Sequence, residues 1–137
     1  MTLQEYLDKN LTKEEQQKRI YNGASRENLT SLENDGNLIN VKELCIQNNK
    51  LKSLKGVEKI PNLEIIYLWN NLLEDISNLK DLKHLEFIGA SFDSIPERYH
   101  HFLDINGYIN GRENVEKLQE FLLYELAQKN IKDQQTV

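Results

Sequence analysis

Residues 41–84 read VKELCIQNNKLKSLKGVEKIPN followed directly by LEIIYLWNNLLEDISNLKDLKH, which are two consecutive rows of 22 residues. Positions 1, 4, 6, 11, 14, 17 and 20 hold an aliphatic residue in both rows, and position 9 is an asparagine, Asn49 in the first row and Asn71 in the second. A fixed period of this length predicts a solenoid, in which each row forms one coil and neighbouring coils stack to bury a shared core.

The register continues on both sides of these rows, although the pattern weakens. A third row starts at Leu85 but has Ala90 at position 6 and Asp93 at position 9. Upstream, residues 29–40 reproduce the second half of a row. The register therefore predicts repeats over residues 27–96.

The spacing L-x-x-L-x-L-x-x-N-x-L resembles that of the leucine-rich repeat, and the 22-residue period is similar to the short class of that family. The resemblance implies an α/β fold: a short right-handed solenoid with a parallel, concave sheet of about three to four strands. In each strand, positions 4 and 6 point into the coil, whereas positions 3, 5 and 7 point to the concave face. We expect the asparagines at position 9 to satisfy backbone groups where each coil turns away from its strand.

The two ends of such a stack expose apolar core and strand edges, so the flanking segments are predicted to be caps. T-x-x-E capping boxes at Thr2 and Thr12 predict two short helices in a helical N-terminal cap over residues 1–26. The C-terminal cap, residues 97–137, is predicted to end in a helix that starts near Asn110. Caps and repeats together form a single domain.

The composition argues against several classes of protein. The chain has 137 residues with 17 Lys and Arg against 22 Asp and Glu, and its net charge of −5 disfavours a nucleic-acid binder. The single cysteine, Cys45, cannot form an internal disulfide, and no spacing suggests a zinc site. The N-terminus lacks the apolar segment of a signal peptide, and no run of residues is apolar enough to span a membrane. We therefore expect a cytoplasmic protein with no cofactor, no metal, and no nucleic-acid or membrane partner.

The concave face is the expected binding site, because the fold does not fix the residues at positions 3, 5 and 7. The second row places Ile65, Tyr67 and Trp69 there, and strand pairing puts Ile65 beside Phe87. Contiguous exposed apolar surface marks interaction sites, and Trp and Tyr are enriched in interface hot spots. The candidate partner-binding residues are Glu43, Cys45, Gln47, Ile65, Tyr67, Trp69, Phe87 and Phe92. The alternative, that the C-terminal segment folds back over Phe87 and Phe92, stays open.

The alternative of a small enzyme has little support in the sequence, which contains no phosphate-binding loop, nucleophile elbow or zinc-protease motif. Its site would lie within residues 96–111 and use His100, His101 or Asp104. That hypothesis requires these side chains to converge in a pocket. An Asn-Gly pair in the same segment predicts the tight turn of a small hairpin.

The resemblance and the apolar patch together predict a non-enzymatic module that binds a partner protein. The preferred role is that of an inhibitor, which masks an enzyme or toxin as an immunity protein does, and a scaffold or adaptor has the same sequence features. RNA binding by stacking on Tyr67 and Trp69 conflicts with the acidic balance of the chain. An exposed aromatic face also suits a homodimer contact, so monomer and homodimer both stay open.

Overall fold

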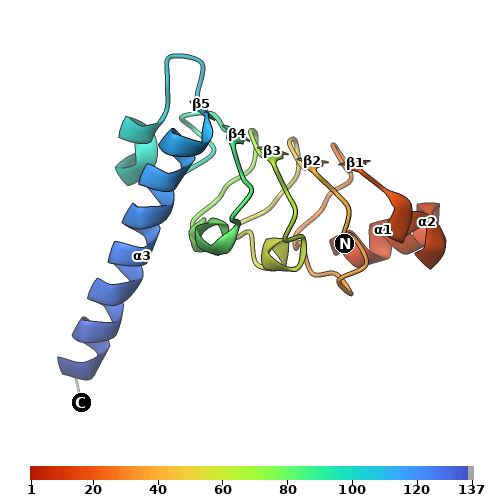
Figure 1. The fold of residues 1–137 in the computed structure, drawn as a ribbon, viewed down its shortest axis with the longest axis horizontal. Helices are drawn as coiled ribbons and strands as arrows, with labels where there is room; N and C mark the ends of the chain where they lie inside the picture. The colour runs from red at the N-terminus through yellow and green to blue at the C-terminus, as the bar shows by residue number, and fades with distance from the viewer. Residues whose placement is uncertain (136–137) are drawn as a thin grey trace.

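The computed structural model describes residues 1–135, and residues 136–137 of the predicted C-terminal cap lie outside this range. The chain winds into coils with a strand on one side and a turn or short 3-10 helix on the other (Figure 1). The strands are β1 (Tyr21–Gly23), β2 (Glu43–Cys45), β3 (Ile65–Tyr67), β4 (Phe87–Gly89) and β5 (Tyr108–Asn110). They form one sheet in this order, in which β1 to β4 are parallel and β5 is antiparallel to β4.

Strand pairing aligns identical row positions of neighbouring coils, as the 22-residue period predicts. Leu44 lies beside Ile66, and Ile66 lies beside Ile88. All three side chains are buried, and each contributes about 1.5 to 3 kcal/mol of transfer free energy. The core is closed on the opposite side by the 3-10 helices η1 (Val57–Lys59) and η2 (Ser77–Asp81). The predicted α/β solenoid is therefore confirmed.

Within residues 1–135 the sheet has five strands, more than the three to four expected, because strands also form in both flanking segments. β1 lies within residues 1–26, for which the sequence predicts only a helical cap. A row that starts at Arg19 places Asn22 at position 4 and Ala24 at position 6. Asn22 is 3% exposed and pairs with Leu44, so it occupies an inner position normally held by an aliphatic residue. This polar substitution conceals the first repeat in the sequence.

The reversal before β5 depends on a glycine. After β4 the chain forms the 3-10 helix η3 (Glu97–Phe102) and then turns at the predicted Asn-Gly pair. Gly107 has a φ of 80°, and a Cβ there would lie 2.7 Å from the carbonyl oxygen of Ala90. A side chain is excluded by both the backbone conformation and the close approach. The turn therefore sets the antiparallel direction of β5.

The N-terminal end of the stack carries α1 (Leu3–Asn10) and α2 (Lys13–Lys18) (Figure 1). Both begin at the predicted threonines. The Thr2 hydroxyl accepts from the N–H three residues later at 3.1 Å, and Thr12 and Glu15 form a reciprocal capping box. These caps satisfy N–H groups that have no partner inside the helix.

The C-terminal end is covered by α3 (Arg112–Gln135), which runs across the stack and extends beyond it (Figure 1). Val115, Leu118 and Leu122 on one face of this helix are buried. Residues three and four apart share a face of an α-helix, which is why these three pack together on the last coil.

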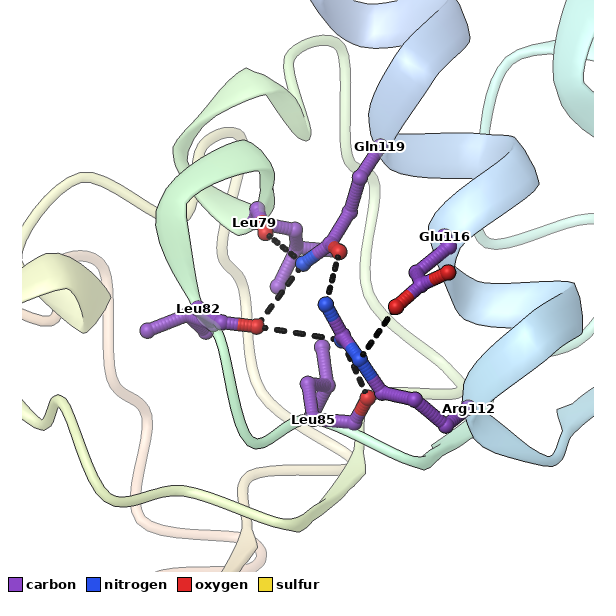
Figure 2. Close-up of polar contacts among 6 residues, drawn as sticks. All are labelled: Leu79, Leu82, Leu85, Arg112, Glu116 and Gln119. Carbon is purple, nitrogen blue, oxygen red and sulfur yellow. Dashed lines mark hydrogen bonds and ion pairs between the residues drawn. The ribbon is translucent and has the colours of Figure 1, made fainter.

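Polar side chains of α3 satisfy carbonyl groups at the end of the last coil (Figure 2). The Arg112 guanidinium donates to the carbonyl oxygens of Leu82 at 3.3 Å and Leu85 at 2.7 Å. It also donates to Gln119 Oε1 at 2.9 Å. The Gln119 amide in turn donates to the carbonyls of Leu79 and Leu82, at 2.8 and 2.9 Å. Helix α3 thus supplies hydrogen bonds that a further coil would otherwise provide.

The asparagines at position 9 form the predicted ladder. The side-chain nitrogens of Asn49 and Asn71 both donate to the carbonyl oxygen of Ile46, each at 3.0 Å. Asn71 Oδ1 accepts from the N–H of Leu51 at 3.0 Å, and Asn49 Oδ1 accepts from the N–H of Leu29 at 3.0 Å. Each asparagine therefore joins its own coil to the preceding one.

Candidate binding face

The outer face of the sheet is the surface formed by side chains at row positions 3, 5 and 7. The strand register aligns Glu43, Ile65 and Phe87 at position 3, and Cys45, Tyr67 and Gly89 at position 5. The predicted neighbourhood of Ile65 and Phe87 is confirmed. Because the aliphatic core lies on the inner side of the same strands, packing does not dictate the residues of the outer face.

Four aromatic rings lie in a continuous row on this face. The ring centroids of Trp69 and Tyr67 are 5.3 Å apart, those of Tyr67 and Phe87 are 5.6 Å apart, and those of Phe87 and Tyr108 are 5.3 Å apart. All four side chains are half-buried. Ring pairs at these distances contribute about 0.5 to 1.5 kcal/mol each beyond burial, so the rings hold one another in place. We call Trp69, Tyr67, Phe87 and Tyr108 the aromatic row.

Tyr108 is a member of the aromatic row that the sequence analysis missed. It stands on β5, directly across from Gly89 of β4. The signal in the sequence is the Asn-Gly turn followed by Tyr108-Ile109-Asn110, in which Ile109 alone is buried. That alternation marks a strand, but its pairing with β4 depends on the tertiary fold.

Gly89 allows the rings to close over β4. A Cβ at this position would lie 2.7 Å from Tyr67 Cδ1 and 3.3 Å from both Phe87 Cε1 and Trp69 Cζ3. The rings therefore occupy the space that a side chain on Gly89 would take.

Gly89→Ala is expected to displace the rings while leaving the fold intact. The group that a new methyl meets is the Tyr67 ring on the outer face, which can tilt, so the free energy of unfolding should fall by only about 1 kcal/mol. The emission of Trp69, the only tryptophan, should shift in the folded state. Fluorescence spectra and urea unfolding measure both quantities, and an unchanged spectrum would contradict the ring arrangement.

The other predicted residues of the face, Glu43, Cys45 and Gln47, lie toward β1. Glu43 and Gln47 are half-buried, whereas Cys45 is only 7% exposed. Burial raises the pKa of the Cys45 thiol, although the hydroxyl of Tyr21 hydrogen-bonds to it. The thiol is therefore protonated at neutral pH and a poor nucleophile. Tyr21 itself is 51% exposed, and the sequence analysis missed it together with β1.

The C-terminal segment covers Phe87 and Phe92 only in part. Phe87 packs against Tyr108 of β5 and stays half-buried. Phe92 is 42% exposed and packs edge-on against His100, with ring centroids 5.3 Å apart. Among the ring contacts of the described residues, Phe92 has none with the aromatic row. The structure therefore brings Tyr67, Trp69 and Phe87 together and leaves Phe92 beside η3.

The three residues of the alternative catalytic site do not converge. His100 Nε2 lies 3.1 Å from the carbonyl oxygen of Ile95, and the His101 ring packs on Phe102 with centroids 4.1 Å apart. The Asp104 carboxylate accepts from two backbone N–H groups of the following turn, at 2.9 and 3.0 Å. Each of the three side chains thus has its own separate neighbours.

A comparison with protein-family models finds a match to the family described as "Leucine Rich repeats (2 copies)" over residues 39–81. The matched segment contains β2, β3, η1 and η2, and with them the asparagine ladder. Residues 39–81 are therefore leucine-rich repeats. No curated protein matches the sequence significantly.

Leucine-rich repeats are protein–protein interaction modules, and the parallel strands β3 and β4 carry Tyr67 and Phe87 of the aromatic row. Within residues 1–135, no group of three or more His, Cys, Asp or Glu side chains is placed to hold a metal ion. None of the helices over the same range is long and apolar enough to cross a membrane.

Proposed function

We propose that this leucine-rich-repeat protein binds a partner protein through the aromatic row on the outer face of the sheet. The observation that carries the proposal is the ring row itself: four half-buried rings in mutual contact on the side of the strands away from the core. Trp and Tyr are the residues most enriched in interface hot spots. Rings that already hold one another lose little conformational entropy on binding, which favours affinity.

A polar margin beside the rings supports the same role. Glu43 and Gln47 flank the aromatic row toward β1, and Glu64 and Glu86 precede β3 and β4. A ring of polar residues around an apolar centre is the usual anatomy of a protein interface. The acidic residues also favour partners with a basic surface.

We further propose that binding inhibits the partner, as an immunity protein masks an enzyme or toxin. The described residues form an aromatic surface suited to contact with a protein, whereas His100, His101 and Asp104 do not come together in a catalytic site. A chain with these features acts best by covering the surface of its partner. The free, protonated Cys45 favours a reducing compartment, and we propose the cytoplasm.

Trp69→Ala is the variant that tests the proposed face. It should lower partner affinity by at least about 2 kcal/mol, roughly 30-fold, and lower the free energy of unfolding by a smaller amount, about 1 kcal/mol, through the lost ring contact with Tyr67. Leu72→Ala is the matched control. Leu72 is an apolar side chain that is 70% exposed, and it stands at row position 10, directly after the ladder asparagine and outside positions 3, 5 and 7 of the outer face. Pull-downs from native lysate with wild type and both variants, followed by mass spectrometry and affinity measurement, give the comparison.

The outcomes separate the competing roles. A partner retained by Leu72→Ala and lost by Trp69→Ala supports the aromatic row, and a partner retained by both variants contradicts it. Assay of the captured protein's own activity with and without this chain then distinguishes an inhibitor from an adaptor, which leaves the activity unchanged. Analytical ultracentrifugation of wild type and Trp69→Ala identifies the remaining case, in which the face forms a homodimer.

A further inference from the structure

A pocket of about 340 Å³ opens beside the aromatic row, and Trp69 and Tyr108, the first and last rings of the row, are among the residues that line it. Trp69 lies two residues after β3, and Tyr108 stands on β5, which is separated from β3 by β4. Alternate strands of a sheet are about 9 to 10 Å apart. The pocket is therefore a gap between two aromatic side chains.

A small residue that follows β4 keeps this gap open. Ser91 lines the pocket at row position 7, the outward position after Gly89. The corresponding position of the preceding row holds Trp69. A side chain of that size in place of Ser91 would fill the space between Trp69 and Tyr108.

Asp93 is the only charged residue among the described residues that line the pocket. It occupies row position 9, where the two preceding rows have the ladder asparagines. Its carboxylate accepts a hydrogen bond from the Ser91 hydroxyl at 2.7 Å. The departure from the repeat pattern at this position thus puts a negative charge beside the rings.

A chain of hydrogen bonds fixes the Asp93 carboxylate. The N–H of Asn70 donates to Ser94 Oγ at 2.6 Å, and the hydroxyl oxygens of Ser94 and Ser91 are 2.6 Å apart. A hydroxyl has one proton to donate. Since Ser91 donates to Asp93, Ser94 must donate to Ser91, and the chain runs in one direction from Asn70 to the carboxylate. Asp93 is therefore held by the backbone through two serines.

Two side-chain amides add neutral acceptors at the pocket. Asn70 and Asn106 both line it. The side-chain nitrogen of Asn70 donates to Asn48 Oδ1 at 2.8 Å, which leaves the Asn70 side-chain oxygen as an acceptor. The pocket thus combines two aromatic rings, one carboxylate and amide oxygens, and no basic side chain contributes to its described lining.

We infer that this pocket receives an arginine side chain of the partner protein. The inference rests on the proposed binding function and names the chemistry that the partner presents. A guanidinium within about 6 Å of a ring centroid is attracted by the ring face, and Trp is the most effective ring for this contact. The flat guanidinium also forms charge-assisted hydrogen bonds with a carboxylate, and its remaining N–H groups match amide oxygens.

The test uses Trp69 emission as a reporter inside the pocket, since the chain has a single tryptophan. The probe is the peptide acetyl-Gly-Arg-Gly-amide, and its control is the same peptide with citrulline, which has nearly the shape of arginine without the charge. The arginine peptide should give a saturable change with an apparent Kd at least about 10-fold lower than that of the citrulline peptide.

Asp93→Asn should reduce that preference several-fold, because it removes the charge of the carboxylate and keeps its shape, while the attraction of the two rings for the guanidinium remains. Asp81→Asn should preserve it, since Asp81 lies in η2 on the other side of the coil and pairs with Lys80 at 3.4 Å. Circular dichroism melting confirms that both variants are folded. Equal affinity of the wild type for the two peptides, or a preference that Asp93→Asn leaves unchanged, overturns the inference.

The test of the arginine pocket can fail independently of the test of the proposed function, because the peptide titration uses no partner protein. If Trp69→Ala loses the captured partner but Asp93→Asn binds that partner with the affinity of the wild type, only the arginine pocket is overturned. A partner unaffected by Trp69→Ala overturns the binding face itself, whatever the peptides show.

Discussion

Gly56→Ala is expected to lower the free energy of unfolding by about 4 kcal/mol or more, enough to unfold a domain of this size in mild denaturant. Gly56 has a φ of 110°, in the left-handed region, and a Cβ there would lie 2.3 Å from the carbonyl oxygen of Leu32 and 2.6 Å from its carbon. Both atoms are backbone of the preceding coil. The Asn34 side chain bridges the carbonyls of Leu32 and Gly56, at 2.9 and 3.0 Å, so the coils cannot separate without breaking these bonds.

Gly36→Ala is the matched control for this prediction. Gly36 also has a positive φ, 82°, but a Cβ at this position would meet no atom within 4 Å beyond its chain neighbours. The alanine there should cost only the backbone strain, about 1 kcal/mol. Urea unfolding of the two variants therefore isolates the contribution of close coil packing. If Gly36→Ala and Gly56→Ala lower the free energy of unfolding equally, the two coils are farther apart at Gly56 than in the structure.

Asn49→Leu is expected to destabilise the protein by about 4 kcal/mol, even though the new side chain is more apolar. The Asn49 amide donates to the carbonyls of Ala24 and Ile46, at 2.9 and 3.0 Å, and accepts from the N–H groups of Glu27 and Leu29, at 3.1 and 3.0 Å. A buried backbone group left without a partner costs about 1 to 3 kcal/mol. Leucine leaves several such groups unpaired where water does not reach them.

Asn49→Asp is the comparison variant for Asn49→Leu. Its carboxylate retains an acceptor for the two N–H groups but loses the donors to the two carbonyls, and it buries a charge among backbone oxygens. If unfolding measurements find Asn49→Leu as stable as wild type, then the ladder asparagine does not join the coils in solution.

The repeats and the asparagine ladder were predictable because their environment recurs. Leu44, Ile66 and Ile88 occupy one position of successive coils, so the same residue type is selected at each and the period is visible in the sequence. The first coil was hidden since Asn22 stands at that position next to the N-terminal helices, where the neighbours differ. Pattern analysis detects repeated environments and misses unique ones.

The candidate site was predictable in its centre and missed at its margins. Tyr67, Trp69 and Phe87 follow from the alternation within strands. Tyr108 enters through an antiparallel pairing that no local pattern specifies, and the arrangement of Asp93 depends on two serines of its own coil and on Asn70 of the preceding one. The cap formed by Arg112 is likewise tertiary, since its carbonyl partners precede it by 27 and 30 residues.

The antiparallel strand β5 also determines how a protein of this kind can grow. A further 22-residue coil added after β5 would present a parallel strand to a neighbour that runs the wrong way, and α3 already occupies the carbonyls at that end. Additional repeats must therefore be inserted between the existing coils. Tandem duplication of residues 63–84 would preserve the strand register and the ladder, and it would add a second Tyr67 and Trp69 to the face. Duplication of an internal row thus widens the contact surface without disturbing either end of the molecule.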